Sequence, residues 1–174
     1  NTLSQLFDSL AVLTSTIPAL FVVAIVALRF GQGFYNIVLA TTLVLLPSFY
    51  RVSKSTALAV LSQPYIEAAE VLGATKIYIA FHYVAREVVQ YIATLSLFSI
   101  PSAISIEMTL SVLGMGFSIS TPSLGQLLSQ GISHFMYAPH LIIIPTLATV
   151  AIVVLFDSLT NPLINKLSAW KDYM

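Results

Sequence analysis

The stretch SQPYIEAAEVLGATK, residues 62–76, is the polar centre of an otherwise apolar chain. Pro64 suits the first turn of a helix, where its missing N–H costs nothing, and Ser62 can cap that turn. Gly73 can end this helix, and Thr75 can cap another one. The stretch therefore predicts a short helix, a tight stop and a second helix.

Both predicted helices carry apolar residues on one face, while Glu67 and Glu70 point elsewhere. The apolar positions follow helical spacing in two sets: Tyr65, Ala68, Ala69 and Leu72, then Ile77, Ala80, Phe81 and Val84. Small alanines on such a face let another surface come close. Two interpretations stay open at this point, a cytoplasmic docking element and an ordinary amphipathic loop that lies on the membrane surface.

Composition indicates the class of protein. The chain has 174 residues, of which 57% are hydrophobic and 8% are charged, against roughly 25% charged residues in a typical soluble domain. A mean hydropathy of +0.93 predicts an all-α, polytopic membrane helical bundle that forms a single domain over residues 1–174. The net charge of zero gives no indication of a basic surface that would bind nucleic acid. The lack of cysteine excludes disulfides and thiolate metal sites.

Four uncharged segments are long enough to be membrane spans. They cover about residues 9–28, 34–50, 88–106 and 137–156. Pro18 predicts a kink in the first span, and Arg51 and Lys54 are expected to mark the exit from the second. The fourth is short, so residues 137–139 are expected to contribute to it. The connecting segments are a polar loop, residues 51–87, and a loop on the opposite side, residues 114–136.

The distribution of basic residues predicts the orientation. With four alternating spans, the polar loop and the C-terminal tail, which includes residues 170–174, share one side. That side holds six of the seven basic residues, and the other side holds only Arg29. The six are Arg51, Lys54, Lys76, Arg86, Lys166 and Lys171. By the positive-inside rule, the polar loop is cytoplasmic.

Glu107 is a charged residue within the third apolar segment, and such residues are usually functional. Together with Ser111 and Gly114 it could line a translocation path. Equally, it could be a structural carboxylate bonded to a neighbouring helix. The glycines and prolines of residues 114–134 indicate irregular backbone, which we expect in the outer mouth or folded back into it.

Several kinds of chemistry have no signature here. No G-x-x-x-x-G-K-[ST] loop occurs, so any ATP must be used by another chain, and no cofactor is expected in this one. His82, His134 and His140 are too scattered for a metal motif. No spacing pairs a nucleophile with a base, so we do not expect an enzyme.

Two motifs resemble a known family. Glu67-Ala68-Ala69, three residues and Gly73 resemble the E-A-A-x-x-x-G signature in membrane subunits of binding-protein-dependent ABC importers, which usually continue to an I-L-P-like ending where this chain has Val84-Ala85-Arg86. E-x-x-L-S-x-L-G-x-G at residues 107–116, followed by T-P-S-x-G, is similar to the dipeptide, oligopeptide and nickel branch of these permeases.

The resemblance implies a type I ABC importer transmembrane domain that lacks its N-terminal helices and lies in the inner membrane. Its ATPase-coupling residues would be Glu67, Ala68, Ala69, Gly73 and Ala74. The implied partners are ATP-binding subunits at residues 62–86, a second homologous permease, an extracytoplasmic substrate-binding protein and membrane lipid. The expected activity is import of peptides or of a metal complex; the alternative is a passive channel or a structural membrane scaffold.

Overall fold

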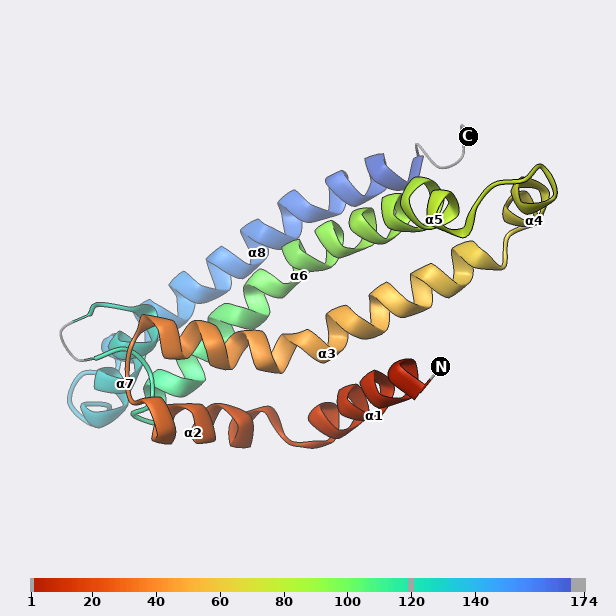
Figure 1. Ribbon diagram of the computed structural model, residues 1–174. Helices are drawn as coiled ribbons and strands as arrows, with labels where there is room; N and C mark the ends of the chain where they lie inside the picture. Colours follow the sequence, from red (N-terminus) through yellow and green to blue (C-terminus); the bar gives the residue numbers. More distant parts are fainter. Residues whose placement is uncertain (1, 119–120, 170–174) are drawn as a thin grey trace.

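The computed structural model describes residues 2–118 and 121–169, with side chains for residues 5–118 and 121–160. Every element described there is a helix (Figure 1). In chain order they are α1 (Thr2–Thr16), α2 (Ala19–Phe30), α3 (Phe34–Leu61), α4 (Pro64–Val71), α5 (Lys76–Ile79), the π-helix η1 (Ala80–Val84), α6 (Ala85–Val112), α7 (Leu124–Ser133) and α8 (His140–Ala169). The predicted all-α membrane bundle is confirmed.

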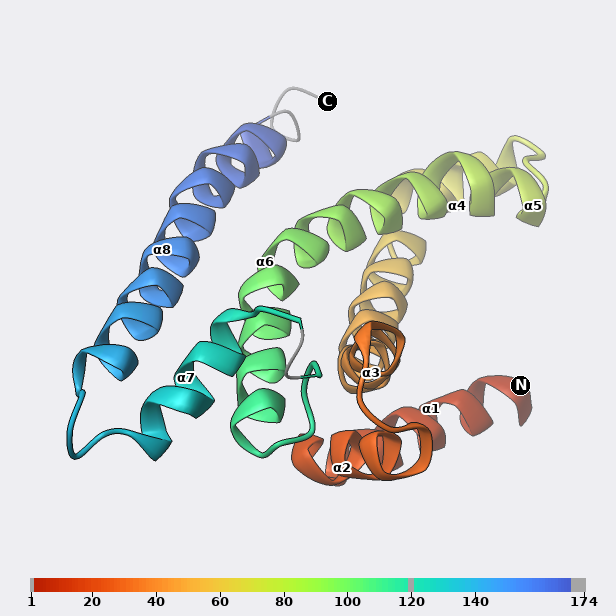
Figure 2. The ribbon, with the colours of Figure 1, turned by 90° about the vertical axis from the view of Figure 1, so that its left-hand side faces the viewer.

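The long helices α3, α6 and α8 run along the length of the bundle, with α3 and α8 both in contact with α6 (Figures 1 and 2). Short helices close its two ends, α4 and α5 at one and α7 at the other. Among the described residues, three helices are long and apolar enough to cross a membrane, or four if the bent α1–α2 pair forms one span. The main core lies between α2, α3 and α6, and its buried members are Val23, Val26, Ile37, Ala40 and Leu110.

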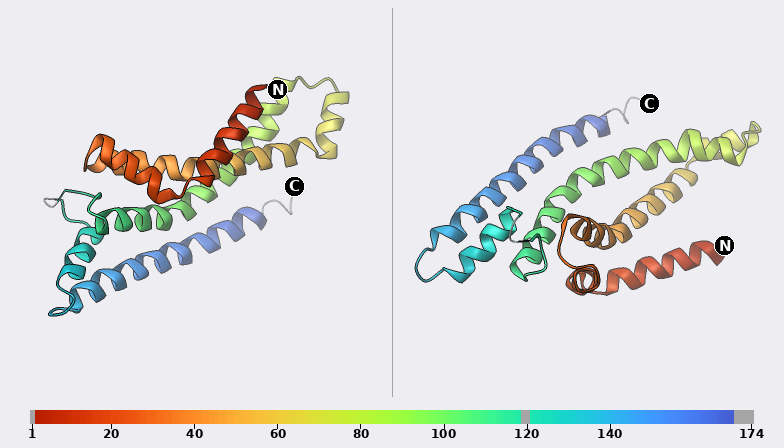
Figure 3. Two further views of the ribbon diagram at one scale, coloured as in Figure 1. Left: turned by 90° about the horizontal axis from the view of Figure 1, so that it is seen from below. Right: turned by 60° about the vertical axis from the view of Figure 1, so that its left-hand side comes forward.

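Pro18 breaks the first predicted span rather than kinking it. The segments Gln5–Thr16 and Ala19–Phe30 meet at an angle of 91°. Figure 3 shows the change of direction between α1 and α2. Proline has no N–H to donate, its ring clashes with the preceding turn, and Ile17 before it is disfavoured in a helix. The expectation of a single kinked helix over residues 9–28 was therefore wrong.

The second span continues beyond its predicted end, because α3 runs to Leu61. Arg51 and Lys54 consequently lie inside the helix rather than at its end, and the expectation that they mark the exit of the second span stays a prediction. Lys54 reaches Asp8 on α1, so its charge has a partner inside the bundle. A basic side chain with a paired head group and a long aliphatic stem need not end an apolar helix.

The predicted second helix of the hairpin is not a separate element. The chain from Lys76 to Val112 forms one continuous helical segment of 37 residues through α5, η1 and α6. The only irregularity between α5 and α6 is the π-turn, where hydrogen bonds widen by one residue without breaking the helix. The second helix of the hairpin therefore continues into the third predicted span, because neither Gly nor Pro follows Lys76 before Pro101.

The last helix begins at His140, so the expectation that residues 137–139 extend it was wrong. Pro139 precedes it, and its carbonyl accepts hydrogen bonds from the N–H groups of Ile142 and Ile143 at 3.1 and 3.3 Å. Proline fits this position before the first turn because it needs no acceptor. The predicted cytoplasmic tail, residues 170–174, lies outside the described residues.

Candidate functional site

The polar stretch forms the predicted hairpin at one end of the bundle. Pro64 begins α4 as expected, but its cap is Gln63, and no side chain bonds to the first turn. The prediction that Ser62 caps this helix was wrong. Because α3 runs to Leu61, Ser62 instead closes the end of that helix, and its hydroxyl donates to the carbonyl of Ala59 at 3.0 Å.

Gly73 ends α4 through a Schellman motif. Its φ of +90° lies in the left-handed region. The N–H of Gly73 donates to the carbonyl of Glu70, and the N–H of Ala74 donates to that of Ala69, both at 3.0 Å. These are the two bonds that define the motif, and glycine adopts the required conformation without strain. A Cβ at Gly73 would meet no atom within 4 Å, so backbone conformation alone requires the glycine within this chain.

A small core holds the hairpin against α3. It consists of Val60, Ile66 and Ile79, which are 7%, 3% and 2% exposed. Ala74 packs against this core. Sequence reasoning missed Ile66, which lies beside the predicted apolar face rather than on it. The buried side of α4 is decided by contact with Val60 of the preceding helix and not by helical spacing.

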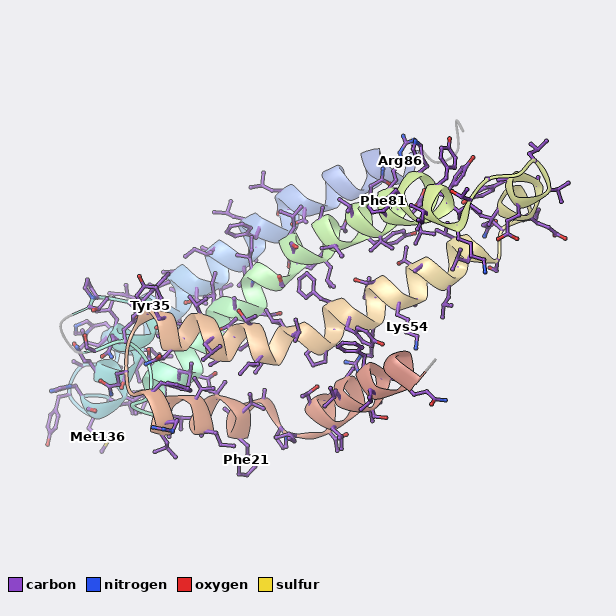
Figure 4. All side chains as sticks on the ribbon, in the orientation of Figure 1. Phe21, Tyr35, Lys54, Phe81, Arg86 and Met136 are labelled. Atoms are coloured by element: carbon purple, nitrogen blue, oxygen red, sulfur yellow. The ribbon has the colours of Figure 1, made fainter. Side chains whose placement is uncertain are left out.

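The predicted coupling residues lie on the outer part of this hairpin. Glu67 and Ala68 are exposed, and Ala69 is half-buried. Beside them stand four large apolar side chains that are between 72% and 87% exposed, which we call the docking patch: Val71, Leu72, Ile77 and Phe81. Figure 4 shows Phe81 and Arg86 at this end of the bundle and Met136 at the opposite end. Exposed large apolar side chains that gather on one hairpin are typical of an interaction site.

Ring contacts and a cap connect the hairpin to α6. Thr75 caps α5 as predicted, its hydroxyl accepting from the N–H of Tyr78 at 3.2 Å. The ring of Tyr78 stacks on His82, with centroids 4.0 Å apart and planes 14° apart. Tyr65 on α4 contacts Tyr83 on η1, with centroids 5.7 Å apart. These contacts tie α4 and α5 to the π-turn through which the long helix begins.

The second group of predicted site residues lies at the opposite end. One carboxylate oxygen of Glu107 accepts two hydrogen bonds, from the hydroxyl of Ser111 at 2.7 Å and from that of Ser123 at 2.8 Å. Ser123 also caps α7, accepting from the N–H of Gln126 at 3.0 Å. We call Glu107, Ser111 and Ser123 the carboxylate cluster; it joins α6 to the first turn of α7.

Gly114 repeats at the end of α6 the motif seen at Gly73. Its φ is +73°. Its N–H donates to the carbonyl of Ser111 at 3.1 Å, and the N–H of Met115 donates to that of Leu110 at 2.8 Å. The amide of Gln32, in the turn before α3, donates to the carbonyl of Gly114 at 2.7 Å. Gly114 therefore fixes where α6 stops and how the next segment turns back.

Ser111 is 1% exposed and Glu107 is half-buried within this chain. Both side chains thus bond to neighbours in the same subunit, as the structural alternative for Glu107 expects. The assignment of Glu107, Ser111 and Gly114 to a translocation path stays a prediction. Sequence reasoning missed Ser123, although a Ser that precedes a helix-forming segment by one residue is an available signal for an N-cap.

No three His, Asp or Glu side chains gather into a metal-binding group in the part of the chain that the structure describes. Of the histidines singled out in the sequence, His82 lies in the Tyr78 stack, and the ring of His134 bonds to the carbonyl of Gln130 at 2.9 Å.

Comparison with known proteins gives one family. The model of the family described as "binding-protein-dependent transport system inner membrane component" matches residues 1–168. The glutathione transport system permease protein GsiD is 29% identical over 144 residues in Escherichia coli O1:K1, in Shigella flexneri serotype 5b and in Escherichia coli O157:H7. Each match covers 83% of this chain and 47% of the relative. The chain thus spans about half the length of the curated relatives that it matches. No solved structure matches it.

Proposed function

This chain belongs to the family of binding-protein-dependent transport system inner membrane components, and we propose that it is part of the permease subunit of an ABC importer. The subunit moves a small solute inward across the inner membrane, in which its apolar helices form a multi-pass bundle. A separate subunit hydrolyses ATP, and this chain holds no cofactor of its own. It is a transport protein rather than an enzyme.

The observation that carries this proposal is the docking patch. Its four side chains are among the most exposed apolar groups of the hairpin, and they stand at the end of the bundle that the charge bias assigns to the cytoplasm. Burying one such side chain is worth about 1.5–3 kcal/mol. A protein partner at this end would recover that free energy, whereas a hairpin that serves only as a connection has no need of these residues.

We assign this partner to the ATP-binding subunit, which would contact residues 62–86. Glu67 and Ala68 would lie at the edge of that contact, with Ala69, Gly73 and Ala74 setting the shape of the hairpin behind it. The exposed apolar faces of the long helices would meet membrane lipid and a second homologous permease subunit. The α7 end would face an extracytoplasmic substrate-binding protein.

The solute that we propose is a peptide or a similar small molecule, such as a metal complex. The support is the name of the relatives, since glutathione is itself a small peptide. A passive channel or a structural scaffold is the alternative, and it is not favoured, because neither would require an exposed apolar docking patch beside the basic residues.

Site-specific photo-crosslinking in the assembled complex tests this proposal. A photoreactive amino acid at Leu72, which is 87% exposed, is expected to crosslink to the ATP-binding subunit. The same amino acid at Met136, which is 86% exposed at the opposite end, is the matched control and should not. Crosslinking of Leu72 to lipid alone would contradict the proposal and favour the surface-loop interpretation.

A further inference from the structure

One helical segment connects the docking hairpin, residues 62–86, to the carboxylate cluster. Lys76–Val112 is continuous over 37 residues, which corresponds to roughly 55 Å at the rise of an α-helix. Ile77 and Phe81 of the docking patch lie in its first turns, and Glu107 lies about one turn and a half before its end. Figures 1 and 2 show this segment running from one end of the bundle to the other. A displacement of Ile77 and Phe81 therefore reaches Glu107 along one helical segment, without crossing a loop.

At the far end, Glu107 is the polar connection from this segment to the first turn of α7. One carboxylate oxygen of Glu107 accepts hydrogen bonds from two hydroxyls, that of Ser111 on the same helix and that of Ser123, 16 positions later in the chain. A negative charge at this place is also favoured by the N-terminus of α7, where the helix dipole is positive. The carboxylate thus holds α7 at a fixed position on α6.

Two glycines on α7 make this position tight. A Cβ at Gly125 would lie 2.6 Å from the Cβ of Ser111 and 2.9 Å from the Cα of Met108, on α6. A Cβ at Gly131 would lie 2.5 Å from the carbonyl oxygen of Leu141, on α8. The helix α7 therefore fills the space between α6 and α8, as Figure 2 shows, and neither neighbour can approach it further.

We propose that Glu107 is a positioning residue for transport: through Ser123 it makes α7 follow α6 when the docking hairpin moves, so that the ATP-driven motion reaches the opposite mouth of the bundle. This rests on the proposed function, since it requires a nucleotide-dependent motion of the hairpin. The glycine contacts then pass the motion on from α7 to the start of α8. In this role Glu107 must accept both hydrogen bonds, but it need not contact the solute.

Distances between spin labels in the complete, reconstituted transporter can test this. One pair, at Gln90 on α6 and Leu58 on α3, reports the motion of α6, and a second pair, at Gln130 on α7 and Val38 on α3, reports the motion of α7; all four positions are exposed. In the wild-type protein we expect ATP to change both distances. In Glu107→Ala and Ser123→Ala only the first distance should change, and uptake per ATP hydrolysed should fall about fivefold or more.

Two further variants separate positioning from other roles. Glu107→Gln keeps an acceptor oxygen for both serines, so it should restore the α7 response and most of the uptake. Ser133→Ala removes a hydroxyl at the other end of α7, where it bonds only within that helix, and should behave as wild type. Ser123→Ala deletes only the hydroxyl of a half-buried serine. It therefore tests the positioning role of Glu107 even if the Glu107→Ala protein fails to assemble.

The outcomes have distinct meanings. The inference would be overturned if ATP changed the α7 distance in Glu107→Ala and in Ser123→Ala as much as in the wild-type protein. It would also be overturned if, in the wild-type protein, ATP changed the α6 distance and left the α7 distance unchanged. A Glu107→Gln variant as inactive as Glu107→Ala would show that the charge itself is needed, which also overturns it. If ATP changes neither distance in the wild-type protein, the proposed function fails, and this inference fails with it.

Discussion

Asp8 on α1 and Lys54 on α3 form an ion pair that joins two helices across 46 positions of sequence. The hydroxyl of Tyr50, one turn before Lys54, donates to the same carboxylate at 2.9 Å. Asp8 lies on α1, on the N-terminal side of the break at Pro18, where the chain changes direction (Figure 3). The ion pair is therefore well placed to hold α1 against the bundle.

Exchanging these two charges tests that role. We expect Asp8→Lys and Lys54→Asp each to lower the melting temperature of the purified full-length protein, because each places two like charges side by side. The double variant should recover most of the loss, since the pair is restored with reversed sign. Arg51→Gln, which removes an exposed charge on the same helix, is the control and should change little. Additive losses in the double variant would mean that the pair does not connect the helices.

Gly73→Leu is expected to uncouple ATP hydrolysis from uptake. A side chain at a positive φ costs about 1–2 kcal/mol of backbone strain, and a Leu here would project from the docking hairpin into space that the partner needs. The helices in lipid are untouched, so the protein should still insert and assemble. Uptake and substrate-stimulated ATPase activity in reconstituted vesicles are the measurements.

Gly31→Leu is the matched control for this experiment. Gly31 has a φ of +81°, and a Cβ there would also meet nothing within 4 Å, but the residue lies in the turn between α2 and α3, far from the hairpin. Both variants therefore place a side chain at a positive φ, at different ends of the bundle, and with its ψ of −166° Gly31 tolerates a side chain no better than Gly73 does. Equal losses of coupling would show that strain, and not the docking surface, explains the phenotype of Gly73→Leu.

Local signals predicted much of the hairpin, because each acts over a few residues. Pro64 at the first turn, the stop at Gly73 and the cap at Thr75 are all confirmed. Such features depend on a missing N–H, a left-handed backbone or a hydroxyl three residues from its donor. None of them needs knowledge of the rest of the fold.

The features that sequence reasoning missed depend on partners far along the chain. The pairing of Lys54 with Asp8 explains why a charge remains inside α3, and the bond from Ser123 to Glu107 explains why α7 folds back onto α6. The angle at Pro18 also depends on distant partners. A proline predicts a break, but the packing of α1 and α2 on α3 decides its direction. The π-turn after Ile79 has no comparable sequence signal.

Cysteine labelling can test the orientation. The structure offers two highly exposed positions at opposite ends, Leu72 and Met136. Because six of seven basic residues are assigned to the hairpin side, Met136→Cys should react with a membrane-impermeant maleimide in intact cells, and Leu72→Cys only after permeabilisation. The sequence has no native cysteine, so none of its own side chains contributes to the labelling signal. The opposite labelling pattern would place the docking patch outside the cell and remove the basis for an ATPase contact.

Gly131→Ala tests how tightly α7 is held between its neighbours. Alanine in a helix is favoured over glycine by about 1 kcal/mol, so an uncrowded site would gain stability. At Gly131, however, the new methyl group would lie 2.5 Å from the carbonyl oxygen of Leu141 and 2.7 Å from its carbon. These are backbone atoms that cannot rotate away, and overpacking of this kind costs about 1–3 kcal/mol. We therefore expect a net loss of stability in thermal denaturation, together with faster hydrogen exchange in α7. The control is Gln130→Ala at an exposed position of the same helix, which should be neutral or slightly stabilising; a Gly131→Ala variant that is equally stable would mean that α7 can move away from α8 at no cost.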